Sequence, residues 1–163
     1  MKTTRTALLL LVVMALAAMR PVRAADLTVR FTGSFEQGTC AFSVPDTHLG
    51  TYLATYFDAN PQSPWVTLAV TAQACTADIR MIHMALRGTA HAVDARLWAI
   101  ATMPGLGIEI QSATNVTAIP NTTVLDWSPS SSMFALRARL SKTGTLTTYG
   151  RVAVPVTLQF TYN

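Results

Sequence analysis

The feature that most constrains the fold is the C-terminal stretch Gly150–Asn163, in which every even position from 152 to 162 is apolar. The residues that alternate with these positions are small or polar, apart from Pro155. Because side chains of a β-strand point alternately to its two faces, this pattern predicts a half-buried strand over residues 152–162. Such a strand needs an apolar core beneath one face and hydrogen-bonding neighbours for its backbone. Which segments supply those neighbours is the central question about function.

The N-terminal segment 1–24 has the pattern of a secretory signal peptide. Lys2 and Arg5 precede an uninterrupted apolar run over residues 7–18, and Val22-Arg23-Ala24 offers small residues before a cut. A membrane anchor is the alternative, but a helix needs about 20 apolar residues to span a bilayer, and this run has 12. The absence of a cysteine near the predicted cut argues against a lipid anchor. We therefore expect an exported chain whose mature form begins at Ala25.

Removal of the predicted signal peptide changes the charge balance. The whole sequence has 12 lysines and arginines against 8 acidic residues, and four of the basic residues (2, 5, 20 and 23) lie in the segment 1–24. The mature chain therefore carries 8 residues of each sign and a formal net charge of zero. Without a basic surplus, neither nucleic acid nor an anionic membrane is indicated as a partner. Near-zero net charge instead favours self-association.

The cysteine content fits an exported domain. The mature chain, which runs from Ala25 to Asn163, suits one domain with a sizeable core. Cys40 and Cys75 are its two cysteines. In an oxidising compartment such a pair predicts one disulfide, which closes a loop of about 36 residues and is worth about 3–4 kcal/mol in the loop-entropy model. The alternative is two free, buried thiols.

A second long alternating stretch, Ala25–Gln37, begins the mature chain, with one face formed by Leu27, Val29, Phe31, Gly33 and Phe35. Between the two ends we expect shorter strands over residues 41–44, 49–57, 65–75, 80–88, 107–112 and 134–140. Residues 90–101 are expected to be irregular or briefly helical, and residues 127–132 to form a loop. Seven or eight short strands without a long helical pattern predict an all-β, antiparallel, immunoglobulin-like sandwich.

Both ends and the cysteines resemble the pilin subunits of chaperone–usher (type 1-like) fimbriae. That family has a glycine at the fourteenth position from its end, then alternating apolar residues and a penultimate tyrosine, and here Gly150 and Tyr162 hold those positions. Val29–Cys40 is similar to the pilin pattern of alternating residues, a glycine and the first cysteine. Smaller similarities lie at Leu49-Gly50, Gly88–Ala90 and Gly105–Ile110. The resemblance covers essentially the whole mature chain.

The resemblance implies an incomplete immunoglobulin-like β-sandwich that lacks its last strand and is completed by a donor strand from a partner. It implies three parts: a signal peptide (1–24), a donor-strand extension (25–37) and a pilin domain (38–163). The implied donor residues are Leu27, Val29, Phe31, Gly33 and Phe35. The implied acceptor groove, which also binds the chaperone, consists of Gly150, Val152, Val154, Val156, Leu158, Phe160 and Tyr162.

The resemblance also implies the partners and the location. A structural subunit of this kind passes through the periplasm, where it meets a fimbrial chaperone and the outer-membrane usher, joins neighbouring pilin subunits and contributes to cell adhesion from a surface fimbria. Cys40 is the sixteenth mature residue, and so short an extension is more similar to minor tip or adaptor subunits than to rod subunits. Pro155 is expected to break one ladder bond of the acceptor strand unless its missing N–H faces away.

The sequence shows no catalytic or metal-binding motif. His48, His83 and His91 lack metal-type spacing, and no nucleophile signature is present. We therefore predict no enzyme activity, no metal and no cofactor.

Two rival interpretations stay open. Trp65, Trp98 and Trp127 would suit a carbohydrate-binding tip lectin if they formed a sugar platform, although buried packing is favoured. A self-contained periplasmic β-sandwich would instead pair the two end strands within one chain.

Overall fold

Eight strands and one short helix make up the described part of the chain, which is Arg30, Thr32 and residues 38–163 of a computed structural model. Residues 38–163 lie within one compact unit, Glu36–Asn163. All strand pairings in it are antiparallel, so the predicted all-β class is confirmed. The elements are β1 (Ala41–Ser43), α2 (Tyr56–Ala59), β2 (Val66–Gln73), β3 (Ile82–Arg87), β4 (Trp98–Ala99), β5 (Leu106–Ser112), β6 (Val124–Trp127), β7 (Met133–Lys142) and β8 (Thr157–Tyr162).

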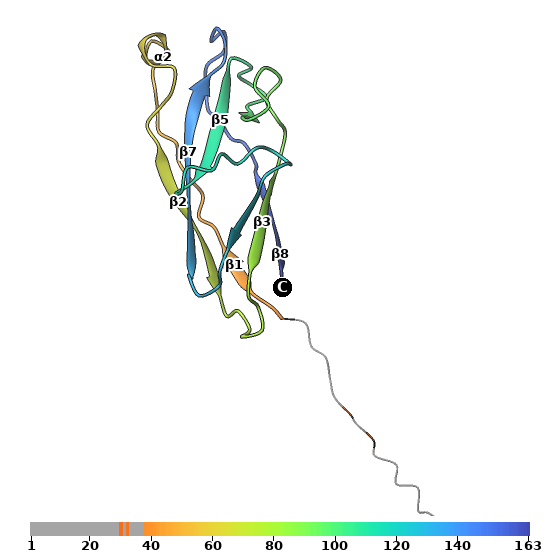
Figure 1. The fold of residues 1–163 in the computed structure, drawn as a ribbon. Coiled ribbons are helices and arrows are strands. Elements are labelled where there is room, and N and C mark those ends of the chain that lie inside the picture. Colours follow the sequence, from red (N-terminus) through yellow and green to blue (C-terminus); the bar gives the residue numbers. More distant parts are fainter. Residues whose placement is uncertain (1–29, 31, 33–37) are drawn as a thin grey trace, which may run out of the picture. The chain divides into compact units, whose positions relative to one another are not determined.

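The strands form two sheets (Figure 1). One sheet has five strands in the order β1-β2-β7-β5-β4, and the other has three in the order β6-β3-β8. β1 and β8 are therefore edge strands of different sheets, and each has one ladder partner. The C-terminus and β1 lie at the end of the sandwich opposite to α2 (Figure 1).

The core lies between the two sheets and is built from the alternating residues that the sequence predicts. In β3 the inward side chains Ile82, Met84 and Leu86 are at most 1% exposed. In β7 the inward residues Leu136 and Ala138 are buried as well. Because each strand places one apolar face inward, the expected strands at 41–44, 65–75, 80–88, 107–112 and 134–140 coincide with β1, β2, β3, β5 and β7 to within a few residues.

The predicted strand over residues 49–57 is wrong. Residues 49–55 form no ladder, and α2 follows them. The rings of Tyr52 and Tyr56 lie 5.0 Å apart, and both contact Phe57, which is 5% exposed. Hydrogen bonds from Tyr56 N–H to Leu53 O and from Phe57 N–H to Ala54 O turn the chain between these two tyrosines, whereas a strand would hold them far apart. Aromatic packing therefore decides the local structure here.

The sequence pattern does not predict β6, because its alternation covers only four residues, with Leu125 and Trp127 buried and Val124 and Asp126 exposed. The loop expected at 127–132 begins one residue later than predicted. Residues 90–101 are mostly irregular, as predicted, except for the two-residue strand β4.

A disulfide joins Cys40, just before β1, to Cys75, just after β2, so the predicted bridge is confirmed. It connects two neighbouring strands of the five-stranded sheet beyond the end of their ladder.

In the described residues, no helix has both the length and the apolar content to cross a membrane.

Candidate functional site

The candidate site is the open edge of β8. All six residues of β8 pair with β3, from Thr157 opposite Arg87 to Tyr162 opposite Ile82. The other edge of β8 has no strand partner within residues 38–163. Because an antiparallel strand directs alternate backbone groups to its two sides, half of the N–H and C=O groups of β8 lack a ladder partner.

The predicted strand over residues 152–162 is wrong in length. Its ladder starts only at Thr157, and no backbone–backbone hydrogen bond joins Gly150–Val156 to the rest of the described residues. The reason lies in β3, which ends at Arg87. The next residue, Gly88, is held by the side chain of Asn121, with Gly88 N–H donating to Oδ1 at 3.2 Å and Nδ2 donating to Gly88 O at 2.7 Å. Beyond it, Thr89 O accepts a hydrogen bond from Ala99 N–H at 2.8 Å and Ala90 forms a bridge with Trp98, so the chain after Gly88 pairs with β4 and not with the C-terminal segment.

Pro155 precedes the ladder and therefore breaks no bond of it, so the expected loss at this residue does not occur. Gly150, at the start of the segment, has a φ of +140°, a backbone conformation that residues with a side chain rarely adopt. A Cβ at this position would meet no atom within 4 Å. The glycine is therefore required by backbone conformation and not by space.

The C-terminal segment presents one apolar face to the core. The odd-numbered residues 151–161 are exposed, and the even-numbered residues pack against the core while keeping part of their surface exposed. In the adjacent strand β3, inward residues at the same depth are almost completely buried. The side of the even-numbered row that faces away from β3 is therefore left partly uncovered by the other described residues. The residues that form this row are Val152, Val154, Val156, Leu158, Phe160 and Tyr162.

The opposite flank of this opening is formed by β1. The ring of Phe42 stacks on that of Phe160, and both rings meet Trp127 edge-on with centroids 6.2 Å apart. Beyond β1, Leu49 and Tyr52 are also partly buried against the core. Sequence reasoning missed Phe42, because nothing in the short segment 41–44 indicates which strand it faces. The predicted donor residues Leu27, Val29, Phe31, Gly33 and Phe35 lie outside the described residues.

The tryptophans do not share a surface. Trp98 and Trp127 are 0% and 6% exposed and belong to the core. Trp65 lies at the outer face of the five-stranded sheet, where the guanidinium groups of Arg137 and Arg139 are 4.4 Å and 4.0 Å from its ring centroid. The expected buried packing therefore holds for two of the three, and arginines cover the third.

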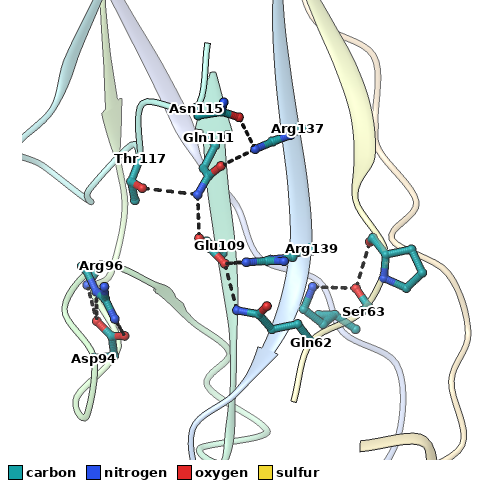
Figure 2. A network of polar contacts seen from close by, with 12 residues as sticks. Gln62, Ser63, Asp94, Arg96, Glu109, Gln111, Asn115, Thr117, Arg137 and Arg139 are labelled. Atoms are coloured by element: carbon teal, nitrogen blue, oxygen red, sulfur yellow. Dashed lines mark hydrogen bonds and ion pairs between the residues drawn. The ribbon is translucent and has the colours of Figure 1, made fainter. Parts of the chain in front are cut away.

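A polar network covers the outer face of β5 and β7 (Figure 2). The Nε and Nη2 atoms of Arg139 both lie 2.8 Å from Oε2 of Glu109, and Gln111 donates to Oε1 at 2.8 Å. Arg137 donates to Gln111 at 2.7 Å and also to Asn115. These groups bond mainly to one another, although Arg137 Nε is buried without a hydrogen-bond partner among the described residues, and the network is a structural feature of the sheet.

The described histidines are separated from one another by the fold. His83 is 2.7 Å from Asp126 on the three-stranded sheet. His91 is buried, and it accepts a hydrogen bond from Val93 N–H at Nδ1 while Nε2 lies 2.9 Å from Pro104 O. Within residues 38–163, no group of three or more His, Cys, Asp or Glu side chains is arranged to hold a metal ion.

A family model described as "Fimbrial protein" matches residues 29–163. The chain belongs to this family. Its fold is similar to the crystal structure of the P pilus rod subunit PapA, with a TM-score of 0.66 and 16% identity over 83% of this chain and 100% of that chain. It is also similar to a chaperone–usher pilus structure that addresses rod uncoiling, with a TM-score of 0.57 and 14% identity over 88% of this chain and 99% of that chain. A search of curated proteins found no match.

These findings confirm the predicted family and the incomplete immunoglobulin-like class of the fold. The fimbrial chain is a structural subunit of a surface fimbria, it interacts with other pilin subunits, and it is not an enzyme.

Proposed function

We propose that this fimbrial chain polymerises head to tail by donor-strand exchange, with the opening between β1 and β8 as the acceptor. The donor is the extension 25–37 of the next subunit, which enters with Leu27, Val29, Phe31, Gly33 and Phe35 facing the core. One observation carries the proposal. The C-terminal segment Gly150–Tyr162 has a continuous apolar row facing the core, yet within residues 38–163 one edge of it is unpaired along its whole length and both edges are unpaired before Thr157.

An added strand would supply what this segment lacks. Its backbone would pair with that of Gly150–Tyr162, and unpaired backbone groups near a core are costly. Four large apolar donor side chains would leave water, each contributing about 1.5–3 kcal/mol. Donor and acceptor surfaces lie on different parts of the chain, so the contact is heterologous and propagates into a fibre instead of closing.

The same opening explains the partners. A periplasmic chaperone would occupy it first, after export directed by residues 1–24, and the outer-membrane usher would then exchange the chaperone for the next subunit's extension. The pilin domain that accepts the strand is 38–163. With only fifteen mature residues before Cys40, the chain suits a minor tip or adaptor position. In that position it contributes to adhesion by building the fibre.

The test is thermal unfolding of a chain that starts at Thr39, with and without a synthetic peptide of residues 25–37. We expect the peptide to raise the melting temperature strongly, because binding to the folded state alone stabilises it by mass action. A peptide carrying Phe31→Glu and Phe35→Glu should have no effect. The matched control, Thr28→Glu and Thr32→Glu on the outward face, should keep it. A stable domain indifferent to all three peptides would mean a closed sandwich and would overturn the proposal.

A further inference from the structure

The most exposed large apolar side chains gather at one end of the sandwich. Leu53, Val93 and Tyr149 are 78%, 74% and 72% exposed, the highest values among the large apolar residues that the structure describes. Single exposed apolar side chains are ordinary, but a group at one end of a domain indicates a surface that is covered in use.

Hydrogen bonds show that these three residues lie at the end of the sandwich that carries α2. Lys142, at the end of β7, donates through Nζ to Phe57 O at 2.9 Å, which ties α2 and the preceding Leu53 to this end. Thr143 lies 3.2 Å from Nε2 of His91, in the loop that carries Val93. Tyr149 follows Thr148, whose hydroxyl donates to Thr102 O at 2.7 Å just before β5, and the first residue of β5 pairs with Lys142. We call this the α2 end (Figure 1).

The other end of the sandwich holds the start of the domain, to which the N-terminal extension is joined. Met133, the first residue of β7, pairs with Thr71, which in turn pairs with Ser43 of β1. Beyond this level, Thr39 O accepts a hydrogen bond from Thr76 N–H at 3.0 Å. Asn163 O accepts one from Arg80 N–H at 2.6 Å. The start of the domain and its C-terminus therefore share one end, the C-terminal end.

The direction of the donor strand and the length of chain that follows it determine where the domain of the next subunit would lie. All observed pairings are antiparallel, and a donor antiparallel to β8 runs from the C-terminal end toward the α2 end. Its last apolar residue, Phe35, would lie beside Gly150. Only residues 36–38 separate Phe35 from Thr39, so at most about 14 Å of chain joins them. The incoming domain is thereby held against the α2 end of the acceptor.

We propose that the α2 end, through Leu53, Val93 and Tyr149, is a docking surface for the C-terminal end of the next copy of this chain. This inference rests on the donor-strand exchange proposed above. The docked face would be the region around the Cys40–Cys75 bridge, including the loop 76–78 and the turn 130–133, where Met133 is 53% exposed. A second, domain-to-domain contact therefore accompanies each exchanged strand and sets the angle between successive subunits.

The direct test is photo-crosslinking of multimers assembled from the full mature chain, with benzoylphenylalanine in place of Leu53 or of Tyr149. We expect crosslinks between chains that map by mass spectrometry to residues 76–78 and 130–133. Val124, 53% exposed on β6, where it pairs with Ala85, is the matched control position and should not label those segments. Crosslinks from 53 and 149 to other segments, or none between chains, would overturn the inference.

A second measurement uses the double variant Leu53→Asp, Tyr149→Asp in the full chain. Its multimers should form but dissociate in guanidinium chloride at least about ten times faster than wild type, a loss typical of a contact worth about 1.4 kcal/mol. Tyr149→Phe and Val124→Asp should match wild type. Unchanged dissociation of the double variant would overturn the docking surface.

The variant Phe31→Glu separates the two proposals. If it abolishes multimers while the Leu53 and Tyr149 experiments fail, the docking surface is wrong and donor-strand exchange stands. If multimers form in spite of Phe31→Glu, donor-strand exchange itself is wrong.

Discussion

The ring of Phe42 in β1 lies flat on the ring of Phe160 in β8, with centroids 3.8 Å apart and planes inclined by 2°. The two strands belong to different sheets and no ladder joins them. The stack is therefore a side-chain link between two free edges. It holds the sandwich together near its C-terminal end, where the core would otherwise open.

Phe42→Ala should lower the free energy of unfolding by about 2 kcal/mol, because a partly buried ring and an aromatic pair are both lost. Urea unfolding followed by tryptophan fluorescence measures this, since Trp127 contacts both rings. Val124→Ala, at a position 53% exposed, should change the stability by less than about 0.5 kcal/mol. Equal effects of the two substitutions would show that the stack contributes nothing.

Arg139→Lys should lower the free energy of unfolding by about 1.5–3 kcal/mol, the size of one lost hydrogen bond to a charged group. Arg139 directs two nitrogens at Glu109, both side chains are at most 19% exposed, and its guanidinium lies over Trp65. An ammonium group neither makes the two-nitrogen contact nor stacks as a plane. Arg80→Lys is the control, because Arg80 is exposed and exposed charges contribute little to stability. Chemical unfolding of both variants should give clearly different losses.

Asp94 gives the chain a pH-dependent contribution to stability. Hydrogen bonds from the Arg96 side chain and backbone hold the pKa of this carboxyl at about 2, below its usual 3.8. A lowered pKa in the folded state stabilises the protein above the unfolded pKa, and the contribution is lost as the pH falls through the folded one. The melting-temperature difference between wild type and Asp94→Asn should thus be constant above pH 4 and shrink between pH 4 and pH 2. A difference that stays constant down to pH 2, or that the exposed Asp46→Asn reproduces, would contradict this role.

Gly88→Ala should destabilise the domain by about 1–3 kcal/mol, the usual range for overpacking. A Cβ on Gly88 would lie 2.8 Å from Cδ1 and 2.9 Å from Nε1 of Trp98, a side chain with no exposed surface and no room to move. At Gly144 the nearest atom to such a Cβ is 3.9 Å away, so Gly144→Ala is the control. Calorimetry of the two variants should show a lower melting temperature for Gly88→Ala alone.

Alternation in the sequence predicts the strands that bury one face, since burial is what the pattern encodes. It fails where another influence decides the structure. Tyr52 and Tyr56 favour a turn through their mutual packing. The length of β8 is set by its partner β3, because the chain beyond β3 pairs with β4 through Thr89 and Ala90. A strand pattern describes one chain segment and carries no information on where the neighbouring ladder ends.

The candidate site was predictable on one side only. The even row from Val152 to Tyr162 follows directly from the period of two, and the structure places these residues on one face. Phe42, on the other flank, belongs to a three-residue strand far away in sequence. Contacts between distant segments leave no local signal, so pattern reasoning could not assign it. The donor residues within 25–37 stay a prediction.

The position of the disulfide has a mechanical consequence. In a fibre under tension, force would enter each subunit through its extension and reach Cys40 first. β1, which follows Cys40, pairs with β2 over only three residues, and so short a ladder would separate from β2 under load. The bond to Cys75 passes the load directly to β2, whose ladder with β7 covers six pairs in the middle of the sheet. The bridge thus works as a tether that routes tension around the short β1 ladder and into the longer ladder between β2 and β7.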